Sequence, residues 1–300
     1  MIEINNLCKG FGDIQAVSGV TMEIKQGCVF GLVGTNGAGK STLLRMLAGI
    51  IQPDEGSIRI GGQPVYEHAE IKREIFYISD DAFFFPNSKP VDMMQYYSHI
   101  YENFDRDQFL SMLRKFGLDA NRRINTFSKG MKKQLSVLLG VCANTRYLLC
   151  DETFDGLDPV MRQAVKSIFA SEIINREFTP IIASHNLREL EDICDYIGLL
   201  HEGGILLSED LEDMKFHIHK LQCVLPEEAL EMELLREMDV LHYEKSGSLL
   251  LVTARGTKTE ILDCVARRNP IFSEVIPLTL EEIFISETEV AGYEVKNILL

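Results

Sequence analysis

Several features that would place a chain in a well-known class are missing from this sequence of 300 residues. It has no run of about 18 apolar residues, which is the length that a helix needs to cross a bilayer. The opening residues MIEINNLCKG also lack the apolar core of a secretory signal peptide. Together, these absences predict a cytoplasmic protein.

Disulfide and zinc frameworks are missing as well. The seven cysteines are scattered without a C-x-x-C pair, so we expect reduced and mostly buried thiols. Positive charge is scarce: the net charge is −15, whereas a general nucleic-acid binder needs a basic surface to displace counterions from phosphates. We therefore expect no direct nucleic-acid partner. With 46% hydrophobic and 25% charged residues, the chain has ordinary globular content.

One glycine-rich stretch is prominent, GLVGTNGAGKSTLLRMLAGI at residues 31–50. Within it, Gly34, Gly39, Lys40 and Ser41 fit the phosphate-loop pattern G-x-x-x-x-G-K-[ST]. The apolar residues before the loop predict a buried parallel strand, and the leucine spacing after it predicts a helix, which is the context that this loop requires. A structural glycine-rich turn is the alternative, but spacing and context together make that coincidence rare.

A phosphate loop binds polyphosphate because its glycines let backbone N–H groups converge on an anion, beside the positive end of a helix dipole. Lys40 would reach the β- and γ-phosphates, and the Ser41 hydroxyl would contact Mg²⁺. The residues expected around the nucleotide are Gly34, Thr35, Asn36, Gly37, Ala38, Gly39, Lys40, Ser41 and Thr42.

A second candidate segment is YLLCDE, an apolar run that ends in Asp151 and Glu152. Ligands of open α/β folds bind at the carboxyl edge of the sheet, where such acids would lie. Asp151 would hold Mg²⁺ through water, and Glu152 would orient or deprotonate the attacking water. Taken alone, two acids after an apolar run more often mark a strand leaving the core. The phosphate loop reverses that preference.

The sequence pattern divides the chain into two parts. Residues 1–214 alternate strand-like and helical patterns, which predicts an α/β domain with antiparallel strands near its start, at 17–24 and 57–60. A helical insertion is expected at about 87–145. Residues 215–300 contain the strand-like KLQCVL and the hairpin-like VLHYEKSGSLLLVTARG, which predict a small C-terminal α+β domain.

Five motifs occur in the order found in the ATP-binding subunits of ABC transporters, which residues 1–214 resemble. They are GTNGAGKST, the signature-like FSKGM, YLLCDE, the D-loop-like FDGLD and IIASHN. The resemblance implies a P-loop NTPase fold with an antiparallel β subdomain and a helical subdomain. It also implies that the protein hydrolyses ATP with Mg²⁺ as cofactor.

The resemblance assigns further roles. Phe11 would stack on adenine; the alternative is that Phe11 is a buried core side chain. Ser128 is expected to cap a helix, and both Ser128 and Gly130 would face the γ-phosphate held by an opposite subunit. Asp158 would contact that subunit; the alternative is that Asp158 is only a turn residue. His185 would sense the γ-phosphate, although a lone histidine at a strand end is usually structural.

The chain also departs from the family pattern. Lys129 and Met131 replace the glycine and glutamine of the commoner LSGGQ signature. Asp80 stands where the family usually places a glutamine that contacts Mg²⁺ and the attacking water. Its side chain is one methylene shorter, but a carboxylate can still order a metal-bound water, so Asp80 is a candidate metal contact.

These features predict an ATPase subunit that forms a dimer with itself or with a homologous partner and drives a separate polytopic membrane subunit. It would therefore lie at the inner face of the cell membrane. The ending LTLEEIFI is similar to the tails of bacterial exporter-type subunits and favours export. One alternative is a soluble ABC ATPase acting on ribosomes or nucleic acid, which usually carries two cassettes or a long coiled-coil insertion. Another is a silent scaffold that only binds nucleotide, which the intact Lys40, Asp151 and Glu152 disfavour.

The stretch DDAFFFP suggests where the membrane subunit would dock. Three successive aromatics cannot all point the same way, so we expect at least one of Phe83, Phe84 and Phe85 to be exposed. An exposed aromatic beside a groove typically anchors a partner helix. The alternative is that all three fill the core.

Overall fold

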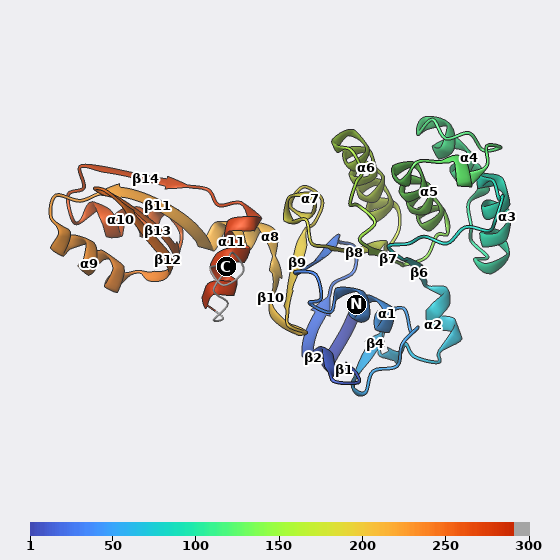
Figure 1. Ribbon diagram of the computed structural model, residues 1–300, viewed down its shortest axis with the longest axis horizontal. Helices are drawn as coiled ribbons and strands as arrows, with labels where there is room; N and C mark the ends of the chain where they lie inside the picture. The colour runs from blue at the N-terminus through green and yellow to red at the C-terminus, as the bar shows by residue number, and fades with distance from the viewer. Residues whose placement is uncertain (291–300) are drawn as a thin grey trace. The chain divides into compact units, whose positions relative to one another are not determined.

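The computed structural model describes residues 1–290 and divides into two compact units, the first comprising residues 1–208 and the second starting at Glu209 (Figure 1). This division comes six residues before the 214/215 boundary expected from the sequence. The reason is that α8 (Leu211–His217) packs on β11 (Ile218–Val224), a strand of the second unit. Within the described residues, no helix has the length and apolar character needed to cross a membrane.

The first unit begins with an antiparallel sheet in the order β2-β1-β4-β5. Its strands are β1 (Ile2–Phe11), β2 (Ile14–Ile24), β4 (Glu55–Ile60) and β5 (Gln63–Pro64). The alternation of apolar and polar residues along β2 buries one face, which includes Val20, Met22 and Ile24. The antiparallel strands expected at 17–24 and 57–60 are confirmed.

A six-stranded sheet with the order β10-β9-β3-β8-β7-β6 forms the centre of this unit. The strands are β10 (Gly204–Asp210), β9 (Tyr196–His201), β3 (Phe30–Val33), β8 (Thr179–Ser184), β7 (Tyr147–Asp151) and β6 (Ile75–Ile78). Neighbouring strands from β9 to β6 pair in parallel. Because β3, β7 and β8 are buried along their whole length, they read as continuous apolar runs. Their carboxyl ends share one edge of the sheet.

Helices cover the six-stranded sheet. Helix α1 (Lys40–Leu47) contacts β2, β7 and β8, and its leucines join the core shared by the two sheets. The predicted helical insertion contains α3 (Pro90–Ile100), α4 (Arg106–Lys115), the short η1 (Ile124–Thr126) and α5 (Lys129–Cys142). Helix α5 contacts α3, α4 and β6 (Figure 1). The remaining helices of this unit are α2 (Ala69–Arg73), α6 (Pro159–Asn175) and α7 (Leu187–Glu191).

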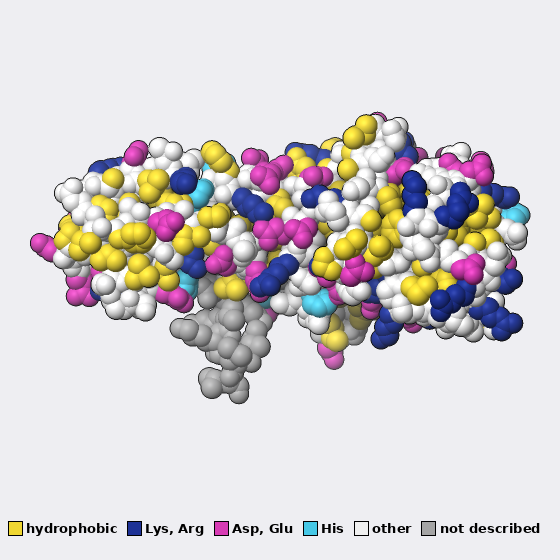
Figure 2. Space-filling view, turned by 90° about the horizontal axis from the view of Figure 1, so that it is seen from above, with side chains coloured by type: hydrophobic (Ala, Val, Ile, Leu, Met, Phe, Trp, Pro, Cys, Tyr) yellow, Lys and Arg dark blue, Asp and Glu magenta, His cyan; other side chains and the backbone are white. Residues whose placement is uncertain are grey.

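Charge is unevenly distributed on the first unit. On the face shown in Figure 2, Lys and Arg side chains gather over the end that carries α3 and α4. Basic side chains are therefore concentrated at this end, although the net charge of the whole chain is −15. All seven cysteines are free thiols, and each is buried except the half-buried Cys8, as the scattered spacing predicted.

The second unit contains an antiparallel sheet with the order β12-β13-β11-β14. Its elements follow the order strand, helix, strand, strand, helix, strand: β11, α9 (Glu228–Glu237), β12 (Asp239–Ser246), β13 (Leu249–Arg255), α10 (Lys258–Ala266) and β14 (Phe272–Ile276). Leu221, Val252 and Val275 share one sheet face and pack against Leu234 and Ile261 of the two helices. Helix α11 (Leu280–Val290) follows.

Candidate active site

The predicted phosphate loop lies between β3 and α1. Gly39 has φ 102°, and a Cβ there would lie 2.1 Å from the carbonyl oxygen of Ala16. A Cβ on Gly34 would lie 2.4 Å from the carbonyl oxygen of Leu200. Both fixed glycines of the motif are therefore required by close backbone approach. They allow the loop to fold tightly at the start of α1.

Lys40 is buried at the first position of α1, with 5% of its surface exposed. Its ammonium group donates to the backbone carbonyls of Gly34 at 2.8 Å and Thr35 at 3.1 Å. It also lies 3.3 Å from Oε1 of Glu152. Because a buried cation needs partners, these contacts fix the ammonium group at the mouth of the loop.

The two predicted nucleotide motifs meet directly. The Ser41 hydroxyl donates to Oδ1 of Asp151 at 2.8 Å, although the residues are 110 positions apart. Asp151 is 1% exposed at the end of β7, and its Oδ2 accepts from the Tyr77 hydroxyl at 3.1 Å. Burial raises the pKa of Tyr77 to about 12, so this phenol remains a donor at neutral pH. Tyr77 was not expected from the sequence, because the expected metal contact in this segment was Asp80, three residues later.

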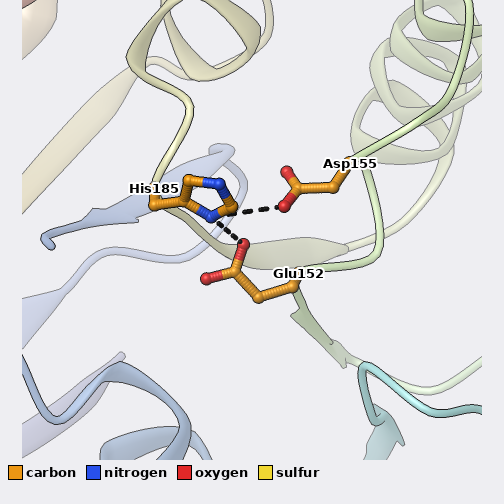
Figure 3. A group of neighbouring side chains, drawn as sticks. All are labelled: Glu152, Asp155 and His185. Carbon is orange, nitrogen blue, oxygen red and sulfur yellow. Dashed lines mark hydrogen bonds and ion pairs between the residues drawn. The ribbon is translucent and has the colours of Figure 1, made fainter. Parts of the chain in front are cut away.

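Glu152, Asp155 and His185 form a cluster beside this pair (Figure 3). Nδ1 of His185 lies 2.9 Å from Oε2 of Glu152 and 3.3 Å from Oδ2 of Asp155. Burial, together with the neighbouring Asp155 carboxyl, raises the pKa of Glu152. Since both partners of Nδ1 are carboxylates, the ring proton belongs on Nδ1, and Nε2 is left for another group.

Two sets of side chains could hold a cation. One atom each from Glu152, Asp155 and His185 lie within 4.8 Å of one another, and this mixed nitrogen and oxygen set suits a transition metal. Ser41 and Asp151 instead offer oxygen atoms only, which is the donor type that Mg²⁺ prefers.

Most of these groups line a cavity of about 450 Å³. Its wall includes Asp80, Glu152, Asp155 and His185, together with six residues of the phosphate loop: Asn36, Gly37, Gly39, Lys40, Ser41 and Thr42. A larger cavity of about 600 Å³ lies elsewhere on the first unit, beside Glu74 and Arg146. These residues precede β6 and β7, so this cavity lies at the amino ends of the strands and not at their carboxyl ends. The larger cavity contains none of the predicted site residues, so chemistry and not size selects the smaller one.

Eight predicted site residues do not line this cavity: Gly34, Thr35 and Ala38 of the phosphate loop, Asp151 of β7, and Phe11, Ser128, Gly130 and Asp158. Phe11 is 48% exposed at the end of β1, so the alternative of a buried core side chain is wrong. The Ser128 hydroxyl caps α5 by accepting from the amide of Met131, as expected, and Asp158 caps α6 in the same way. Gly130 lies beside the carbonyl oxygen of Gly156. Their nucleotide and dimer roles stay predictions.

Asp80 lines the cavity but has another partner. Its side chain is 67% exposed, and Oδ1 lies 3.7 Å from the ammonium group of Lys133. Lys133 also donates to the backbone carbonyl of Glu152 at 2.6 Å. No sequence signal marked Lys133. Asp155 lay in the FDGLD motif but was not expected to contact His185.

The aromatic stretch behaves as expected. Phe83 is 69% and Phe85 40% exposed, which contradicts the alternative that all three phenylalanines are buried. Phe85 also packs edge-on against Phe83 and Tyr96, with ring centres 5.5 and 4.9 Å apart. These rings border a cleft of about 240 Å³ between β6 and α3.

Comparisons with known proteins agree with this geometry. The family model described as ABC transporter matches residues 17–155. The ABC transporter ATP-binding protein YtrB of Bacillus subtilis is 28% identical over 96% of this chain and 98% of its own. The lantibiotic transport ATP-binding protein SrtF of Streptococcus pyogenes is 32% identical over 71% of this chain and 95% of its own.

The fold is also found among solved structures. An ATP-binding cassette solved as a dimer in a post-hydrolysis state with ADP and Pi superposes with a TM-score of 0.63 at 20% identity, over 70% of this chain and 99% of that one. The match to SrtF spans nearly all of that relative at 32% identity, which is enough to establish kinship. The chain therefore belongs to the ABC transporter ATP-binding proteins, the ATPase subunits of these transporters.

Proposed function

We propose that this chain hydrolyses Mg²⁺-bound ATP at the cavity lined by the phosphate loop, and that Glu152 orients or deprotonates the attacking water. The observation that carries the proposal is the meeting of the two nucleotide motifs. Lys40 lies 3.3 Å from Glu152, and Ser41 lies 2.8 Å from Asp151. Phosphoryl transfer depends mainly on positioning and electrostatic stabilisation, which this arrangement can supply.

Ser41 and Asp151 fit a magnesium site. Their two oxygen atoms are 2.8 Å apart, and Asp151 is held in place by Tyr77. Mg²⁺ favours such carboxylate and hydroxyl oxygens and completes its shell with water and phosphate oxygens. When bound, the ion neutralises charge on the β- and γ-phosphates. Asp80, on the cavity wall, is a further candidate for ordering a metal-bound water.

Each remaining residue has a proposed step. Lys40 exchanges its contacts with Gly34, Thr35 and Glu152 for the β- and γ-phosphates. Release of the ion pair with Lys40 leaves Oε1 of Glu152 free to accept a proton from water. The raised pKa of Glu152 suits a general base, because proton transfer is most efficient when the pKa of the base approaches the working pH. His185 lies on the cavity wall with Nδ1 against the Glu152 and Asp155 carboxylates, and its proposed role is to sense the γ-phosphate.

We propose that two chains close on ATP head to tail. Ser128 and Gly130 begin α5 but do not line the cavity of their own chain, so they are available to a second nucleotide. The N-terminus of this 14-residue helix suits an anion. Asp158 would contact the partner, and the exposed Phe11 would stack on adenine. A cassette of this fold has been solved as a dimer, which supports the proposal.

The proposed output is transport through a separate membrane subunit at the inner face of the membrane. One relative is named for lantibiotic transport, which supports export of an antibiotic-type compound. Residues 1–214 would form the ATP-binding domain and residues 215–300 an accessory domain that supports or regulates it. No observation favours the alternative of a soluble ATPase acting on ribosomes or nucleic acid.

Glu152→Gln tests the proposal. The variant should bind ATP about as tightly as the native protein in calorimetry, while phosphate release falls by about 100-fold or more, because the base is lost and the shape is kept. Glu177→Gln, which removes an exposed carboxylate elsewhere, is the control. Unchanged phosphate release in Glu152→Gln would remove this glutamate from the mechanism.

A further inference from the structure

The backbone of Glu152 is unusual. Its φ is 48°, a left-handed conformation that side chains other than glycine, asparagine and aspartate rarely adopt. The amide of Glu152 still donates to the carbonyl of Ala183 at 3.0 Å, which continues the pairing of β7 with β8. Its carbonyl oxygen is instead held by a side chain, the ammonium group of Lys133 at 2.6 Å. The position of the proposed base therefore depends on a lysine from another element.

Lys133 comes from α5, the helix that begins with the signature residues Ser128 and Gly130. Only 18% of its side chain is exposed, so the side chain is partly shielded from water. A charge-assisted hydrogen bond in such surroundings is stronger than one at the surface. The hydrogen bond from Lys133 to Glu152 therefore joins the first turns of α5 to the carboxyl end of β7.

The same ammonium group reaches a second segment of the cavity. Oδ1 of Asp80, in the loop after β6, lies 3.7 Å from it. An ammonium group has three donors, so one lysine can serve the Glu152 carbonyl and the Asp80 carboxylate together. Among the described residues, Lys133 itself does not line the cavity, whereas both of its partners do.

We propose that Lys133 is a positioning residue that ties the signature helix α5 to Glu152 and Asp80, so that the proposed base and the signature segment move together. The inference rests on the proposed role of Glu152 in hydrolysis. It goes beyond that role, because it assigns to Lys133 the control of where Glu152 sits. Lys133 acts through Glu152 and Asp80 and does not touch nucleotide.

The geometry makes Lys133→Met informative. Methionine keeps the length and the apolar stem of the side chain but has no charge and no donor. Loss of one half-buried, charge-assisted hydrogen bond should lower kcat by about 10- to 100-fold, while KM and the calorimetric affinity for ATP change by less than about two-fold. Lys133→Arg, which keeps the charge and the donors, should recover part of the loss.

Lys132→Met is the matched control. Lys132 precedes Lys133 on the same helix, and its ammonium group makes no hydrogen bond or ion pair within residues 1–290. This variant should retain native kcat and KM. A lower melting temperature in Lys133→Met with native kcat would mean that Lys133 is only structural, and equal losses of kcat in the two variants would also refute the proposal.

Asp80 supplies a second test. If Lys133 positions both groups, Asp80→Asn and Lys133→Met should be non-additive in kcat, because the two side chains share one contact. Strict additivity would show that Lys133 does not act through Asp80. The two proposals are tested separately. Unchanged phosphate release in Glu152→Gln would show that Glu152 is not the base, whereas unchanged kcat in Lys133→Met would remove only the proposed link between Glu152 and α5.

Discussion

Glu189 offers a test of the electrostatics around the site. Its side chain is 6% exposed, lies 3.0 Å from Arg162, and has one carboxyl oxygen without a hydrogen bond among the described residues. Burial and the negative charge of Asp155 raise the pKa of Glu189 to about 7, from an ordinary value of 4.5. The charged form is therefore disfavoured in the folded protein, in spite of Arg162.

The sign of the pH effect follows from this shift. Below pH 4.5 the carboxyl is protonated in both states, so wild type and Glu189→Gln should have similar free energies of unfolding. Between pH 4.5 and 7 the unfolded chain loses the proton while the folded chain keeps it, so wild type loses stability relative to the variant. A shift of this size corresponds to about 3 kcal/mol at pH 8.

The assay is denaturant unfolding of both proteins at pH 5 and pH 8, with Glu177→Gln as a control for removing an exposed charge. Taking the difference between variant and wild type cancels every other titrating group. Glu189→Gln should be the more stable protein at pH 8 and should lose that advantage at pH 5. A difference that does not change between the two pH values would refute this account of Glu189.

Three further predictions concern the site and its docking surface. Lys40→Ala should weaken ATP binding by about 10-fold or more in calorimetry, because it removes a buried, charge-assisted contact, and native affinity would contradict the role of Lys40. Asp155→Asn should lower kcat by about 10-fold with ATP affinity retained, because His185 loses one of its two carboxylate partners; a native kcat would show that Asp155 is dispensable. Phe83→Asp should release the protein from membranes that carry its partner while ATP affinity is kept, whereas Ile174→Asp, at a residue 84% exposed on α6, should not. Retained membrane association of Phe83→Asp would argue against docking at this cleft.

Local patterns in the sequence predicted the parts of the fold that depend on neighbouring residues. The phosphate loop and the capped start of α5 follow from glycine spacing and from Ser128, and the hairpin of the second unit was predicted from the stretch VLHYEKSGSLLLVTARG. The exposed Phe83 followed from the geometry of three successive aromatics. The strand order β12-β13-β11-β14 did not follow, because it is set by packing between segments distant in sequence.

The contacts that position the site were harder to predict for the same reason. Lys133 and Glu152 are 19 residues apart, and His185 and Glu152 are 33 apart, so no local periodicity relates them. Asp80 was expected to contact metal because of its place in a motif, whereas in the structure its carboxylate lies near Lys133. A family motif indicates which chemistry a position serves, but the partner of a substituted residue depends on the tertiary fold.

The central claim is that two chains close around ATP and reopen after Glu152 acts. The most direct measurement is the molecular mass of Glu152→Gln with Mg²⁺-ATP, by gel filtration with light scattering. The account predicts that the variant shifts from one chain to two when ATP is added, and that Ser128→Arg in the same background abolishes the shift, because Ser128 begins the helix that would face the partner's nucleotide. A variant that stays at the mass of one chain while still turning over ATP would contradict the account.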